Sequence, residues 1–130
     1  MKKLLLLFVI LLFSVTVNSQ SKWDIPETYT TMKNQVLFNQ EIDKEYSRVL
    51  YNKHCKSCHG KEGYGDGPKA DDLNGDLGDF STEEFNQQSD GVLFYKTKFG
   101  KDDMPAYKRK MTDEEIWLTV HYMRTLEEKD

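Results

Sequence analysis

The sequence lacks an excess of basic residues. Its 18 Lys and Arg residues stand against 22 Asp and Glu residues, which gives a formal net charge of −4 at pH 7. No stretch interleaves basic and aromatic residues in the way that binding surfaces for nucleic acids do. The composition therefore gives no indication of a nucleic acid partner.

Long apolar runs are also scarce. The sequence contains one such run, and it lies at the N-terminus. Lys2 and Lys3 precede residues 4–17, which are almost wholly apolar, and Asn-Ser-Gln follows at 18–20. A charged start, a short apolar run and a small residue are typical of a secretory leader. The run is short for a membrane span, so we expect a leader over residues 1–19 that is cleaved, in preference to an uncleaved anchor. No cysteine lies near that boundary, so a lipoprotein anchor is not indicated.

Cysteines are few as well, and the two that occur, Cys55 and Cys58, stand three positions apart. Residues 54–59 read His-Cys-Lys-Ser-Cys-His and contain Cys-x-x-Cys-His, the spacing that attaches a c-type haem. Two thiols on one helical turn can reach the two vinyl groups on one edge of a porphyrin and form thioethers. His59 would then lie beneath the iron as the proximal axial ligand. The motif predicts one covalently bound haem c.

Other interpretations of the same residues stay open at this point. In an oxidising compartment the two cysteines can form a disulfide, and Cys-x-x-Cys alone also suits a thioredoxin-like thiol pair. Such a pair needs a strand–helix setting, and no strong period-2 pattern occurs near Cys55. Residues 54–59 also supply zinc-ligand types, but an ordinary tetrahedral zinc site spaces its second ligand pair farther along the chain.

Two glycine-containing loops support the haem interpretation. Residues 60–68 contain four glycines, which let the backbone turn tightly against a flat object. Residues 100–107 place Met104 in a loop bounded by glycine and proline, where a thioether could face the iron from the side opposite His59. We expect Met104 to be the distal ligand, with Met111 the next candidate and an open distal site the third alternative.

From about Glu41 to Leu126 the chain resembles a class I mono-haem c-type cytochrome. The motifs Cys-x-x-Cys-His-Gly, Gly-x-Gly-Asp-Gly-Pro and Met-Pro-Ala-Tyr occur in the family's order. The resemblance implies a small all-α domain around one covalently attached haem, with the N- and C-terminal helices crossing. It also implies that the backbone carbonyl of Pro68 accepts a hydrogen bond from Nδ1 of the proximal histidine. The cytochrome domain would cover residues 41–128, preceded by an N-terminal extension over residues 20–40.

Helical periodicity predicts several elements of such a domain. A first helix would begin at Asn39 and run into Cys55, with an apolar face formed by Ile42, Tyr46, Val49 and Leu50. Capping boxes at residues 81–84 and 112–115 would open two further helices, and Asp90 would cap another that ends at Gly100. The residues expected to face inward are Phe80, Phe85, Ile116, Val120 and Met123. In the extension before Asn39, an extended arm anchored by Trp23 and Ile25 and a mobile tether are both consistent with the sequence.

A histidine and a methionine at the iron would leave no open position for a substrate, so we expect a one-electron carrier and not an enzyme. The alternatives are a haem-bearing subunit of a larger oxidoreductase, and a haem enzyme with an open distal site. Because the resemblance implies haem attachment outside the cytoplasm, we expect the protein in the periplasm, as part of a respiratory chain. It would contact a membrane only through a partner complex or an uncleaved leader.

The charges suggest how redox partners dock. Loss of Lys2 and Lys3 with the leader leaves 16 of the 18 basic residues against 22 acidic ones, a net charge of about −6. Basic residues nevertheless gather on both sides of Met104: Lys96, Lys98, Lys101, Lys108, Arg109 and Lys110. Two interpretations stay open: this segment steers an acidic partner toward the haem edge, or its residues are ordinary solvated charges.

Overall fold

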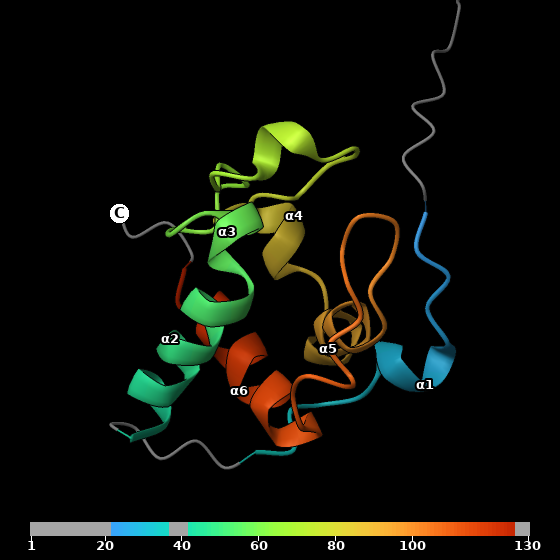
Figure 1. Cartoon of the computed structure of the whole chain (residues 1–130). Coiled ribbons are helices and arrows are strands. Elements are labelled where there is room, and N and C mark those ends of the chain that lie inside the picture. Colours follow the sequence, from blue (N-terminus) through green and yellow to red (C-terminus); the bar gives the residue numbers. More distant parts are fainter. Residues whose placement is uncertain (1–21, 37–41, 127–130) are drawn as a thin grey trace, which may run out of the picture.

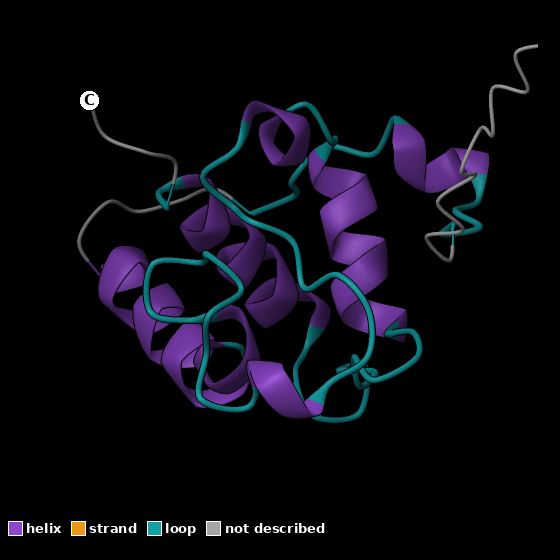
Figure 2. Cartoon of the chain, turned by 90° about the horizontal axis from the view of Figure 1, so that it is seen from above, coloured by secondary structure: helices purple, strands orange, loops and turns teal. Residues whose placement is uncertain are grey.

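The computed structural model describes residues 22–36 and 42–126, so the expected leader and the start proposed for the first helix lie outside the described residues. The described chain is helical and contains no strand, as Figure 2 shows. In chain order the helices are α1 (Glu27–Thr30), α2 (Ile42–His54), α3 (Lys56–His59), the 3-10 helix η1 (Ala70–Asp72), α4 (Glu83–Asn86), α5 (Asp90–Phe99) and α6 (Asp113–Arg124). Within these residues no helix combines the length and the apolar character needed to cross a bilayer.

Helices α2 and α6 pack against each other and form the base of the domain (Figure 1). The face that α2 buries consists of Ser47, Leu50 and Tyr51, spaced three and four residues apart as one side of a helix requires. The predicted apolar face was wrong in part, because Tyr46 and Val49 are 43% and 45% exposed. Ser47 is fully buried, and its small side chain allows the two helices to approach closely.

The predicted start of α6 is confirmed. The Thr112 hydroxyl accepts a hydrogen bond from the Glu115 backbone N–H, and the Glu115 carboxylate accepts one from the Thr112 N–H at 2.7 Å, which completes the capping box. Ile116, Val120 and Met123 are buried as expected. The resemblance-based expectation of an all-α fold with the first and last domain helices in contact is therefore correct.

The remaining helix starts differ slightly from those predicted. Thr82 is the N-cap of α4, and its hydroxyl accepts a hydrogen bond from the N–H of Phe85 at 3.3 Å. Ser89, and not Asp90, is the N-cap of α5. The Asp90 carboxylate instead accepts hydrogen bonds from the guanidinium of Arg124 at 3.0 and 2.9 Å, so it is not available as a cap. Phe85 is buried in the core, as expected.

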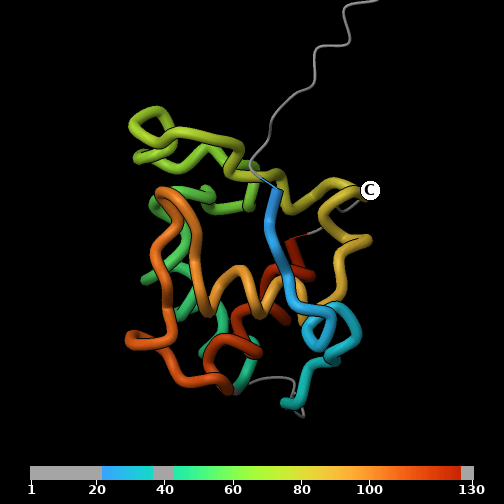
Figure 3. Tube along the Cα trace, turned by 90° about the vertical axis from the view of Figure 1, so that its right-hand side faces the viewer, coloured from blue at the N-terminus to red at the C-terminus, as the bar shows by residue number. Residues whose placement is uncertain are grey.

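The extension packs on α5 through α1, as Figures 1 and 3 show, and farther along the side-chain amide of Asn34 donates to the carbonyl of Trp117 in α6 at 3.0 Å. The N–H of Gly91 donates to the carbonyl of Met32 at 3.1 Å, and a β-carbon at Gly91 would lie 2.1 Å from the carbonyl oxygen of Tyr29. The Trp23 ring lies beneath the ammonium groups of Lys96 and Lys101, 5.5 and 5.7 Å from the ring centroid. This part of the extension is therefore a docked arm, and it contains a short helix, α1, that the sequence did not predict.

Candidate haem site

The Cys-x-x-Cys-His motif forms one helical turn directly after α2. The N–H groups of Cys58 and His59 both donate to the carbonyl of Cys55, at 3.1 and 2.9 Å. Cys55 is buried, Cys58 is half-buried, and both are free thiols. This turn holds the two sulfurs and the imidazole on one short segment, as thioether attachment to a single porphyrin requires.

The environment of Cys55 differs from that of a redox-active thiol pair. Burial, with a smaller contribution from Cys58, raises the pKa of the Cys55 thiol to about 12. Nucleophilic cysteines in Cys-x-x-Cys redox motifs have lowered pKa values, because the thiolate is the reactive form. The site therefore favours cysteines that are held for attachment over a thiol–disulfide exchange pair.

The His59 ring packs against the aromatic ring of Phe80. Its ring centroid lies 4.8 Å from that of Phe80, with the ring planes 32° apart. Burial lowers the pKa of His59, and a backbone hydrogen bond with Leu77 acts in the opposite direction. Burial therefore favours the neutral ring, the form in which imidazole binds a metal.

The Nδ1 atom of His59 is buried and has no hydrogen-bond partner among the described residues. The hydrogen bond to the carbonyl of Pro68 that the resemblance implies is accordingly not formed in the structure. Pro68 is exposed and lies in the loop that returns past the motif. A buried polar nitrogen without a hydrogen-bond partner is rare in protein interiors. The Nδ1 atom of His59 therefore lacks a hydrogen bond that such an atom normally makes.

The glycine loop after His59 folds back onto the motif. The N–H of Gly67 donates to the carbonyl of Cys58 at 3.1 Å, and that of Lys69 donates to the carbonyl of Ser57 at 2.9 Å. A β-carbon at Gly67 would lie 2.5 Å from the Ser57 carbonyl oxygen, so only glycine fits at this approach. The loop thus fixes the backbone that carries Cys58.

Met104 lies where the sequence placed it, in the loop between α5 and α6. Gly100 ends α5 with a φ of 61°, and Lys101 and Met104 then exchange two backbone hydrogen bonds of 2.9 Å each. Met104 is half-buried, whereas Met111, the alternative ligand, is 5% exposed and belongs to the hydrophobic core. Of these two methionines, Met104 is therefore the one whose thioether is accessible to a ligand-binding role.

Tyr107 joins the Met104 loop to the cysteine motif, a contact that the sequence did not reveal. Its hydroxyl donates to the carbonyl of His54 at 2.5 Å, and its ring is buried. Burial, with smaller contributions from both cysteines, raises the pKa of Tyr107 to about 12, so the hydroxyl remains a donor. The one available signal was its place in the Met-Pro-Ala-Tyr motif.

These residues fit haem c. Two free thiols and an imidazole on one helical turn, together with a half-buried thioether, form the donor set that holds this group. The described residues contain no group of three or more His, Cys, Asp or Glu side chains that could hold a metal ion, so the zinc interpretation has no support there.

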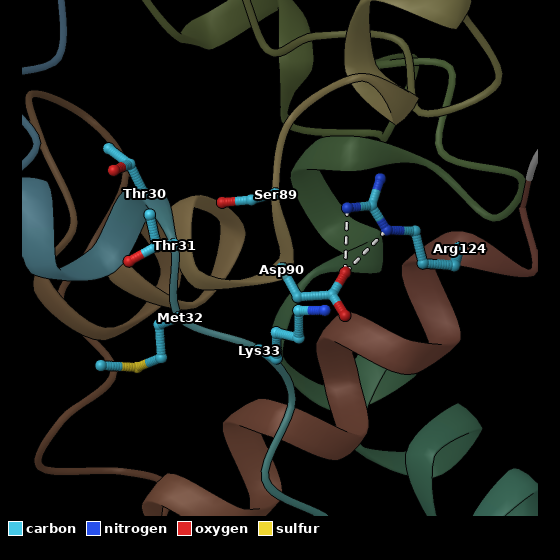
Figure 4. A pocket seen from close by; sticks show the side chains of 7 residues that line it. All are labelled: Thr30, Thr31, Met32, Lys33, Ser89, Asp90 and Arg124. Atoms are coloured by element: carbon cyan, nitrogen blue, oxygen red, sulfur yellow. Dashed lines mark hydrogen bonds and ion pairs between the residues drawn. The ribbon is translucent and has the colours of Figure 1, made fainter.

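A surface pocket lies elsewhere, where the arm meets the start of α5 and the end of α6. Figure 4 shows its lining residues: Thr30, Thr31, Met32, Lys33, Ser89, Asp90 and Arg124. Besides its bonds to Asp90, the Arg124 guanidinium donates to the carbonyls of Asn86 and Gln88 at 3.1 and 2.5 Å. Arg124 is thus occupied in joining α6 to the chain before α5, and the pocket is unrelated to the haem site.

The comparisons with known proteins agree with this site. The family model described as cytochrome c oxidase, cbb3-type, subunit III matches residues 45–123, more than half of the chain. The chain therefore belongs to this family of c-type cytochromes, and the expected resemblance to mono-haem c-type cytochromes is confirmed. No curated protein matches the sequence.

Two solved structures are similar to the chain. One is the Kuenenia stuttgartiensis reducing HAO-like protein complex Kustc0457/Kustc0458, with 28% identity and a TM-score of 0.61 over 75% of this chain and 50% of that one. The other is the KustC0563 c-type cytochrome, with 27% identity and a TM-score of 0.56 over 63% of this chain and 98% of that one. The chain thus spans about half of the first structure and nearly all of the second.

Proposed function

We propose that the protein is a one-electron carrier with a single haem c, held by thioethers to Cys55 and Cys58 and ligated by His59 and Met104. The observation that carries the proposal is that Cys55, Cys58 and His59 share one helical turn, with both thiols free and the imidazole packed against Phe80. Haem c, when bound, supplies a one-electron couple at its iron.

The chain's own residues would bind the group, shield it and exclude other chemistry. Cys55 and Cys58 would fix it to α3, and His59 and Met104 would fill both axial positions, so that no substrate reaches the iron. Phe80 is buried and packs against His59, so it would limit access of water to the histidine side of the haem. A sulfur ligand in place of a second imidazole favours the ferrous state and raises the potential.

The ferric spectrum of the purified holoprotein tests the proposed ligands. We expect a weak far-red sulfur-to-iron absorption that disappears in Met104→Ala and persists in Met32→Ala, a control at another half-buried methionine. High-spin spectra and ready carbon monoxide binding by the wild-type protein would contradict the proposal and favour a haem enzyme with an open distal site.

We also propose that the carrier works outside the cytoplasm, after cleavage of residues 1–19, and that it docks on acidic redox partners. Two lysines of the basic segment already have partners, because Lys98 pairs with Asp113 and Lys96 is hydrogen-bonded to Gln88. Three further cations are exposed just after the Met104 loop: Lys108, Arg109 and Lys110. These exposed cations support the steering proposal.

Rates of electron transfer as a function of ionic strength test the docking proposal. Charge reversal at Lys108 or Lys110 should slow transfer to the partner at low salt, with the effect fading as salt increases. Lys44→Glu, at an exposed position on α2, is the matched control and should leave the rate unchanged. A rate indifferent to salt would contradict steering.

A second candidate is a haem-bearing subunit of a larger oxidoreductase. It is favoured by the likeness to a chain of a reducing HAO-like protein complex, of which this chain spans half. Purification of the tagged protein from its native membranes and soluble fraction separates the two candidates. A stoichiometric complex supports the subunit, and a free monomer supports the diffusing carrier.

A further inference from the structure

Met104 lies at one end of a tight turn that needs outside support. Its backbone is bonded to Lys101, Asp102 and Asp103 form the tip between them, and Asp102 has a φ of 50°. A left-handed backbone at a residue other than glycine raises the energy of the turn. Such a conformation persists where neighbouring contacts hold it.

One of these contacts comes from the loop between η1 and α4. The Asp103 carboxylate accepts a hydrogen bond from the backbone N–H of Asn74 at 2.7 Å, and the Asn74 side-chain amide lies 3.4 Å from the same oxygen. Asn74 is 29 residues away in sequence, and in Figures 1 and 3 its yellow-green loop lies over the tip of the orange loop that carries Met104.

The loop that carries Asn74 also contacts His59, the expected proximal ligand. Three residues after Asn74, the backbone of Leu77 interacts with His59. The contact between Asp103 and Asn74 thus connects the segment next to one expected axial ligand with the segment next to the other. Because Asp103 directly precedes Met104, a restraint on its side chain limits how far the Met104 backbone can move.

We propose that Asp103 is a positioning residue for Met104, whose carboxylate holds the Met104 loop in place through Asn74. The proposal rests on Met104 being an axial ligand. The bond is charge-assisted, which strengthens it, but both residues are exposed, so its effect is modest. The hydrogen bond determines how readily the Met104 loop opens, and its loss should leave the rest of the protein folded.

Imidazole binding to the ferric holoprotein measures this opening, because imidazole competes with Met104 for the iron. We expect Asp103→Ala to bind imidazole about three- to tenfold more tightly than the wild-type protein, since loss of the bond raises the open population. Asp103→Asn keeps an oxygen acceptor and should give a smaller increase. Asp71→Asn, which removes a charge from an exposed position on η1, is the control and should match the wild type.

A second readout follows the contact itself. Hydrogen exchange at the Asn74 amide should accelerate in Asp103→Ala, because that N–H loses its acceptor. A lower thermal midpoint with unchanged imidazole affinity would overturn the proposal in favour of a structural role. Failure of the underlying function would differ: the wild-type protein would then bind imidazole as tightly as Met104→Ala.

Discussion

The hydroxyl of Tyr51 donates a buried hydrogen bond of 2.8 Å to the carbonyl of Gly60. Tyr51 is fully buried on the face of α2 that packs on α6, and Gly60 directly follows His59. Burial raises the pKa of Tyr51, so this hydroxyl stays protonated and remains a donor. The bond fixes the end of the Cys-x-x-Cys-His turn to the core of the domain.

Tyr51→Phe should lower the free energy of unfolding of the holoprotein by about 1–2 kcal/mol, because the Gly60 carbonyl is left buried without its donor. Denaturant titration measures this change. Tyr64→Phe, at a tyrosine that is 49% exposed, is the matched control and should change stability by less than about 0.5 kcal/mol. Equal stability of the two variants would contradict the role assigned to Tyr51.

Gly91→Ala should release the arm from α5. Its new methyl group would occupy the space of the Tyr29 carbonyl oxygen and the Met32 side chain, so the arm must move. The backbone of the arm would then become more accessible, and limited proteolysis of the holoprotein should cleave within residues 22–36 faster than in the wild type. Val92→Ala, at the neighbouring half-buried position, is the control and should be cleaved at the wild-type rate.

An unchanged rate of cleavage in Gly91→Ala would mean that the arm tolerates the methyl group and is not fixed by this close approach.

Sequence reasoning was most reliable where one local rule decides the structure. The capping box at Thr112 specifies its own hydrogen bonds, and the helical turn at residues 55–59 follows from the spacing of the haem motif. The apolar face of α2 was mispredicted because the exposed Tyr46 and Val49 are more apolar than Ser47, which is buried. Only the position of α6 selects Ser47 and Tyr51 for the interior.

Contacts between distant segments could not be predicted. Asn74 and Asp103 are unremarkable polar residues in two loops, and their contact depends on how α3 and α5 place those loops. The docking of the arm likewise depends on Gly91, where a β-carbon would not fit. The sequence contains eight glycines, and nothing in it distinguishes Gly91 from the others.

Glu115→Gln should remove a pH-dependent part of the stability. Hydrogen bonds from Tyr46 and from the Thr112 backbone lower the pKa of the Glu115 carboxyl in the folded state below its ordinary value of 4.5. A lowered folded-state pKa contributes stability that is complete above about pH 4.5 and is lost as the pH falls through the folded-state pKa. The wild-type advantage over Glu115→Gln should therefore shrink in acid.

Urea unfolding at pH 7 and at pH 3 to 4 tests this prediction. Glu114→Gln, in the same exposed first turn of α6, is the control and should show no comparable pH-dependent difference. A wild-type advantage that is constant across this range would contradict the assigned cause.

The central claim is that one haem is bound covalently through Cys55 and Cys58. Its most direct test is the intact mass and visible spectrum of the full-length protein expressed with export and a competent cytochrome maturation system. We predict a chain that has lost residues 1–19, gained the mass of one haem, and shows a c-type spectrum that survives denaturation. A colourless protein of unmodified mass would contradict the account.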